Sequence, residues 1–94
     1  MRYFLVCYDV ADAKRWRQVF KVMKKHGEHW QYSVFFCRLR AIDRTRLEIE
    51  LRGILDTDED RAFICDLGPD EQQAMAAFTP FGIQQIHSER LRIV

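Results

Sequence analysis

The sequence has 94 residues, of which 48% are hydrophobic and 31% charged, a composition typical of one soluble globular domain. This length excludes two separate cores, and a domain so small buries only about 60 to 65% of its unfolded surface, so it gains stability from a partner. The net charge of +1 hides an asymmetry, because residues 1–52 carry twelve Lys or Arg against six Asp or Glu, whereas residues 53–94 carry three against eight.

The first predicted element is a strand over residues 2–9. Tyr3, Leu5 and Cys7 alternate with Phe4, Val6 and Tyr8, so both sides of the strand are apolar. This pattern indicates a central, buried strand. The apolar run ends at Asp9.

An amphipathic helix is predicted from Ala13 to His26. Its apolar residues are spaced at i, i+3, i+4 and i+7, namely Trp16, Val19, Phe20 and Met23. Asp12 is a suitable N-cap and Gly27 a suitable stop. The rest of the helix is basic and free of acidic residues between its first and last lysines: Lys14, Arg15, Arg17, Lys21, Lys24 and Lys25.

Residues 28–40 are rich in aromatic and β-branched types and predict strand. Thirteen residues is long for one strand, so we expect a break near Ser33 and two consecutive strands. Asp43 is predicted to cap a second helix, whose apolar stripe consists of Leu47, Leu51, Ile54 and Leu55.

A fourth strand is predicted over residues 61–67, followed by a short helix over residues 70–78. The order β, α, β, β, α, β predicts an α+β, ferredoxin-like sandwich. We expect a single domain over residues 1–94, with a core at about 1–67. The tail, residues 68–94, is expected to contact a partner, with an additional strand within Ile83–Val94.

Asp9 is the first candidate for chemistry, because its carboxylate follows a buried strand and precedes a helix. Asp at such a position often accepts backbone hydrogen bonds in the loop, and that role stays open. In a two-fold dimer, two Asp9 carboxylates could instead meet and hold Mg²⁺, which typically takes one or two carboxylates together with water and phosphate oxygens.

The basic helix face is the second candidate, as a phosphate-binding surface that gives affinity without sequence specificity. Arg38 and Arg40 extend the basic character into the sheet and the second helix. The alternative is an ordinary solvated helix face. The aromatic residues Trp30, Tyr32, Phe35 and Phe36 are expected to pack in the core rather than to stack on bases.

Three cysteines, Cys7, Cys37 and Cys65, lie far apart in apolar runs and predict buried free thiols. A three-thiolate zinc site is the weaker alternative, because no C-x-x-C pair is present. The apolar runs are too short to span a membrane, and the Met1-Arg2-Tyr3 start is unlike a signal peptide, so we expect a cytoplasmic protein without a membrane partner.

Five short features occur in an order and spacing that resemble the CRISPR-associated protein 2 family over residues 3–67. They are Tyr8-Asp9-Val10, Asp12, Arg15, Gly27 and Gln31-x-Ser33-Val34-Phe35. The resemblance implies a ferredoxin-like homodimer in which the two copies of Asp9 share a magnesium ion. It also implies a role in spacer acquisition, as a subunit that contacts the CRISPR integrase and binds double-stranded DNA or single-stranded RNA.

On this interpretation Asp9 is the metal ligand and a catalytic residue. Arg15 and Arg17 are expected to neutralise charge during phosphodiester hydrolysis. Nucleic acid is expected to lie on Lys14, Arg15, Arg17, Lys21, Lys24, Lys25, Arg38 and Arg40. Two other hypotheses stay open, a non-catalytic scaffold for the integrase and a stand-alone RNA-binding or toxin-type ribonuclease domain.

Overall fold

The computed structural model describes residues 1–82. Its elements are β1 (Arg2–Asp9), α1 (Ala13–His26), β2 (Gly27–Gln31), β3 (Val34–Leu39), α2 (Ala41–Ile54), β4 (Arg61–Gly68) and α3 (Glu71–Ala76). The predicted element order is confirmed, and so is the break at Ser33, which lies in the turn between β2 and β3. The added strand expected within Ile83–Val94 lies outside the described residues.

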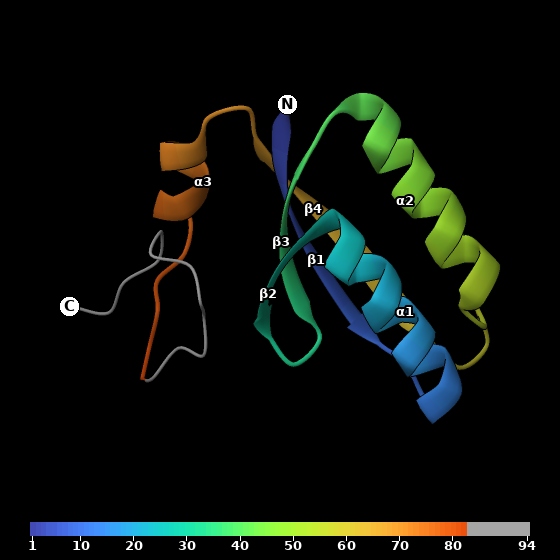
Figure 1. The fold of residues 1–94 in the computed structure, drawn as a ribbon. Helices are drawn as coiled ribbons and strands as arrows, with labels where there is room; N and C mark the ends of the chain where they lie inside the picture. Colours follow the sequence, from blue (N-terminus) through green and yellow to red (C-terminus); the bar gives the residue numbers. More distant parts are fainter. Residues whose placement is uncertain (83–94) are drawn as a thin grey trace.

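The four strands form one antiparallel sheet in the order β2-β3-β1-β4. Helices α1 and α2 lie side by side on one face, and α3 lies on the other side of the sheet (Figure 1). This is the predicted ferredoxin-like arrangement. β1 is central, as its two apolar sides indicated, and it ends with Asp9 opposite Arg61 of β4.

The main core lies between the sheet and the two long helices. It contains Phe4, Val6 and Tyr8 of β1, Val19 and Met23 of α1, Phe35 and Cys37 of β3, and Leu47 and Leu51 of α2. The predicted stripes therefore face the sheet, with Trp16 and Phe20 partly buried at its border. Burying such side chains stabilises the fold by about 1.5 to 3 kcal/mol each.

The opposite face of the sheet is also apolar but only partly covered. Tyr3, Trp30 and Phe36 are buried with Ala74 of α3. Further along the same face, Leu5 and Cys7 of β1 are half-buried, and Phe63 of β4 is 61% exposed. Among the described residues, this end of the face has no covering element.

One local prediction needs correction. Helix α2 begins at Ala41 with Arg40 as its N-cap residue. Asp43 therefore lies in the first turn and is not the N-cap. Its carboxylate accepts a hydrogen bond from Arg40 Nε at 2.7 Å. Gly27 ends α1 as predicted, and its backbone there is extended. Glycine is needed there because a Cβ would collide with Cys37 Sγ and the Phe36 carbonyl oxygen.

Within residues 1–82, no helix is both long and apolar enough to cross a membrane.

Candidate nucleic-acid interface and metal ligand

Asp9 is an exposed carboxylate at the end of β1, with 76% of its side chain accessible. Its Oδ2 lies 3.3 Å from Arg61 Nη2 on the neighbouring strand. Strand alternation places Asp9 on the same face as Leu5 and Cys7, the face that is incompletely covered. Asp9 and Arg61 line a depression of about 380 Å³ together with Cys7, Tyr8 and Phe63.

Tyr8 precedes Asp9 but its side chain lies on the opposite face, within the core beneath the helices. The residue is only 5% exposed. Burial, and secondarily the nearby Tyr32, raises the pKa of the Tyr8 hydroxyl to about 12. Tyr8 therefore stays protonated at neutral pH, which argues against a role as a general base beside Asp9.

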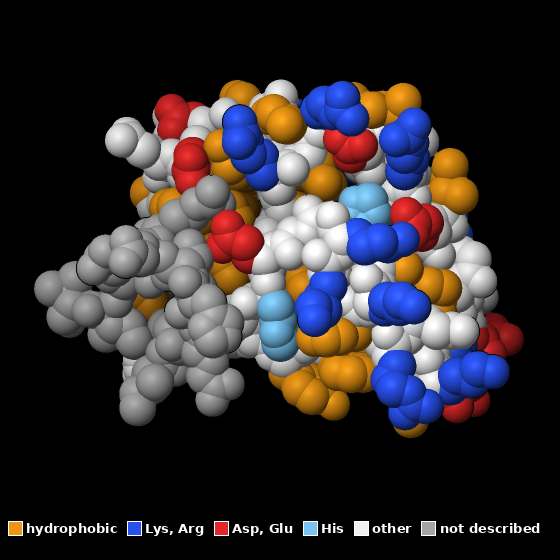
Figure 2. Space-filling view, viewed as in Figure 1, with side chains coloured by type: hydrophobic (Ala, Val, Ile, Leu, Met, Phe, Trp, Pro, Cys, Tyr) orange, Lys and Arg blue, Asp and Glu red, His pale blue; other side chains and the backbone are white. Residues whose placement is uncertain are grey.

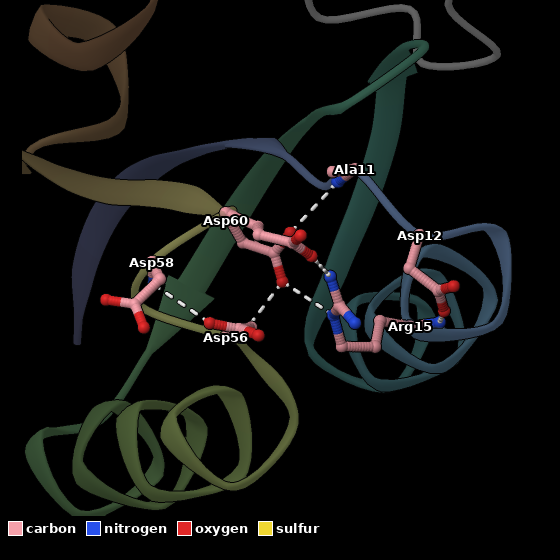
Figure 3. Close-up of polar contacts among 7 residues, drawn as sticks. Ala11, Asp12, Arg15, Asp56, Asp58 and Asp60 are labelled. Atoms are coloured by element: carbon pink, nitrogen blue, oxygen red, sulfur yellow. Dashed lines mark hydrogen bonds and ion pairs between the residues drawn. The ribbon is translucent and has the colours of Figure 1, made fainter.

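The loop that follows Asp9 is held by a buried carboxylate, Asp60, immediately before β4 (Figure 3). The Asp60 side chain is fully inaccessible. Its oxygens accept hydrogen bonds from the backbone N–H of Ala11 at 2.9 Å and of Asp56 at 2.9 Å. Arg15 adds two more, from Nε at 2.8 Å and from Nη2 at 3.2 Å.

These contacts shift both ionisation equilibria toward the charged forms. The hydrogen bond from Arg15, followed by those from the two backbone N–H groups, holds the pKa of Asp60 well below its ordinary value. The hydrogen bond to Asp60, with a further one to Glu59 at 3.0 Å, raises the pKa of Arg15. Asp60 thus ties the loop after Asp9 to helix α1 and to the segment that enters β4.

Sequence reasoning missed Asp60, because it is one of four acidic residues in the segment 56–60. It also expected Arg15 to face phosphate. In the structure the side chain of Arg15 is 23% exposed, and its guanidinium is bound to two carboxylates. That Arg15 neutralises charge on a substrate stays a prediction. The role that its contacts indicate is structural, because its guanidinium is bound to Asp60 and Glu59.

Basic side chains lie along the outer face of α1 (Figure 2). Lys14, Arg17 and Lys21 are exposed and form no ion pair with any residue from 1 to 82. Lys24 lies over the Phe20 ring at 5.5 Å, and Lys25 pairs with Glu50 of α2 at 3.1 Å. The predicted basic face therefore exists, and three of its cations are unpaired.

Arg38 and Arg40 do not join this face. Arg38 of β3 is opposite Tyr3, so its side chain projects from the face of the sheet that α3 covers, away from α1. Arg40 is paired with Asp43, and the hydrogen bond to that carboxylate raises its pKa. Their expected contact with nucleic acid stays a prediction. A nucleic acid bound to α1 would have to extend beyond this helix to contact them.

Within residues 1–82, no group of three His, Cys, Asp or Glu side chains is placed to hold a metal ion.

The three cysteines are free thiols, as expected. Cys37 is fully buried, and burial raises its pKa to about 12. The expectation of a buried Cys65 is wrong: Cys65 is exposed, because it lies opposite Leu5 on the face of the sheet that is incompletely covered.

The family described as CRISPR associated protein Cas2 matches residues 1–75. The chain belongs to the Cas2 family. The family resemblance seen in the sequence is thereby confirmed.

Individual Cas2 proteins show how far the likeness extends. A relative from Rhodospirillum rubrum, named CRISPR-associated endoribonuclease Cas2 1, is 45% identical over 73 residues, covering 78% of this chain and 72% of its own. Another, from Halalkalibacterium halodurans, is named CRISPR-associated endonuclease Cas2 and is 35% identical, covering 68% and 72%. The crystal structure of Streptococcus pyogenes Cas2 has a TM-score of 0.74 at 28% identity, covering 85% of this chain and 99% of that one.

Proposed function

We propose that this protein is the nucleic-acid-binding subunit of CRISPR spacer acquisition, acting as a homodimer that bridges copies of the CRISPR integrase. The observation that carries the proposal is the acid-free face of α1, where Lys14, Arg17 and Lys21 are exposed and unpaired. Cations without protein partners are available to phosphates, and such contacts bind nucleic acid independently of its sequence.

A homodimer is supported by the uncovered apolar end of the sheet. Leu5, Cys7 and Phe63 lie there on the same face as Asp9, so a second copy that covered them would bring two Asp9 carboxylates into one region. We expect Phe63→Glu to convert a dimer to a monomer in sedimentation equilibrium. A wild-type monomer at micromolar concentration would contradict this part of the proposal.

Asp9 fits half of a Mg²⁺ site. It supplies a hard oxygen ligand that is well exposed, while no other described side chain completes a ligand set with it. The remaining carboxylate of a shared site would come from Asp9 of the second copy. Bound Mg²⁺ would neutralise phosphate charge and assist ionisation of the attacking water. In this chain, Asp60 holds the loop that follows Asp9, and the α1 cations position the phosphates.

A scaffold without nuclease activity is the second candidate, and the contact between Arg61 and Asp9 favours it. The guanidinium of Arg61 neutralises the Asp9 carboxylate, which would otherwise be available to bind a metal cation. If the contact is inhibitory, Arg61→Ala increases Mg²⁺-dependent cleavage. If the protein is a scaffold, Arg61→Ala leaves cleavage absent.

The experiment that tests the proposal measures binding and cleavage together, on labelled double-stranded DNA and on single-stranded RNA with Mg²⁺. We compare wild type with Asp9→Asn, and with Asp58→Asn as a control at another exposed carboxylate of a loop. Loss of cleavage in Asp9→Asn alone, with binding intact, supports the metal-dependent nuclease. Binding without cleavage in all three proteins supports the scaffold, and absence of binding to both substrates contradicts the proposal as a whole.

A further inference from the structure

An exposed stack of aromatic rings lies at the tip of the β2–β3 hairpin. Tyr32, in the turn, is 75% exposed. Its ring stacks on Trp16 of α1 with the centroids 5.3 Å apart and the planes at 27°. Trp16 stacks in turn on Phe20, at 5.2 Å and 10°. The expectation that all the aromatic residues of this segment pack in the core therefore fails for Tyr32.

Contacts beneath the stack hold it in place. Trp16 Nε1 donates a hydrogen bond to Ser33 Oγ at 3.4 Å, and His29 Nε2 lies 3.1 Å from the carbonyl oxygen of Tyr32. Phe20 meets the rings of His29 and Phe35 edge-on, at 5.1 and 5.7 Å. A Tyr ring supported in this way from one side offers its other side to solvent at little further cost in conformational entropy.

Cations of α1 lie next to the residues of the stack. Arg17 and Lys21 follow Trp16 and Phe20 on α1, and both are exposed without ion-pair partners within residues 1–82. Lys24 lies against Phe20. Figure 2 shows hydrophobic side chains gathered near the hairpin tip and bordered by Lys and Arg side chains over α1. An open aromatic ring beside phosphate-binding cations is the combination that binds unpaired nucleotides.

We propose that the outer face of Tyr32 stacks on an unpaired nucleobase, so that this protein prefers nucleic acid with a single-stranded end over a blunt duplex. The inference rests on the proposed nucleic-acid binding and adds a ligand class to it. The interior of a duplex presents no free base face to Tyr32, whereas an overhang does. Stacking on one aromatic ring raises affinity by about 5- to 100-fold, with little dependence on sequence.

The test measures affinity by fluorescence anisotropy for a blunt DNA duplex and for the same duplex with a short overhang, made either of DNA or of RNA. We compare wild type, Tyr32→Phe, which keeps the ring, and Tyr32→Ala, which removes it. Ile49→Ala on α2 is the control, because Ile49 is another hydrophobic residue that is 64% exposed.

Wild type, Tyr32→Phe and Ile49→Ala are expected to bind the overhang substrates about tenfold more tightly than the blunt duplex. Tyr32→Ala is expected to lose that preference while its affinity for blunt duplex is unchanged. Equal affinity of wild type for all substrates overturns the inference and leaves the proposed function standing. The same holds if Tyr32→Ala loses affinity for the blunt duplex and for the overhang substrates to the same extent. Absence of binding to any substrate overturns both. The two kinds of overhang show whether the base is taken from DNA, RNA or both.

Discussion

Asp60→Asn removes the charge from a carboxylate whose side chain is fully inaccessible, while keeping its shape. The wild-type carboxylate accepts four hydrogen bonds, from two backbone N–H groups and from Arg15 twice. The variant leaves the Arg15 guanidinium without its closest anionic partner and turns an amide N–H toward one of these donors. Loss of one member of a buried pair is among the larger single-site effects, so we expect Tm to fall on the order of 15 °C.

Calorimetry at neutral pH measures this change directly, and a pH series tests its cause. Because the folded pKa of Asp60 is depressed, its contribution is fully present above the ordinary Asp pKa of 3.8 and is lost as the pH falls through the folded value. Wild type and Asp60→Asn should therefore converge in stability in strong acid. Arg2→Gln, which breaks an exposed pair with Asp66, is the control and should lower Tm by less than about 5 °C.

A double-mutant cycle tests whether Asp60 and Arg15 act as a pair. Arg15→Gln combined with Asp60→Asn removes both charges, so the double variant should be less destabilised than the sum of the single changes. Additive losses, or a Tm for Asp60→Asn within about 3 °C of wild type at neutral pH, would refute the reasoning that this pair secures the loop after Asp9.

Two further predictions concern packing and thiol exposure. Gly27→Ala places a Cβ against Cys37 and should lower the free energy of unfolding by about 1 to 3 kcal/mol in urea titrations. Gly53→Ala, in an open part of α2, should raise it by up to about 1 kcal/mol, and the reverse order would contradict the packing described. With a thiol reagent at pH 8, Cys65 should react first and Cys37 only on unfolding, so that Cys65→Ser removes the fast phase. Persistence of the fast phase in Cys65→Ser would show that another thiol is exposed.

Local patterns predicted much of the fold, because the decisive signals lie within single elements. The two apolar sides of residues 2–9 indicated a central strand, and the spacing from Trp16 to Met23 indicated which side of α1 is buried. The length of the aromatic run predicted the break at Ser33. The position of Asp9 at the end of its strand was also predicted from a local signal, the end of the apolar run.

What the sequence did not reveal depends on contacts between distant segments. Asp60 and Arg15 are 45 positions apart, and nothing in the acidic loop distinguishes Asp60 from its neighbours. Cys65 looked buried because its strand is apolar, but its exposure follows from the pairing of β4 with β1, which places it on the incompletely covered face of the sheet. Arg38 appeared to extend the basic helix face, and only the pairing of β3 with β1 shows that it projects from the opposite side.

The central claim, that the unpaired cations of α1 bind nucleic acid, is tested most directly by the salt dependence of duplex DNA affinity. Lys14, Arg17 and Lys21 are changed together to Gln, and the control changes to Gln Arg2, Arg46 and Arg52, which are also exposed but lie elsewhere. Both variants lose three positive charges. The account predicts that only the α1 variant binds weakly, with the slope of log K against log salt reduced by about 3. Equal weakening of both variants would show that net charge alone drives binding and would contradict the claim.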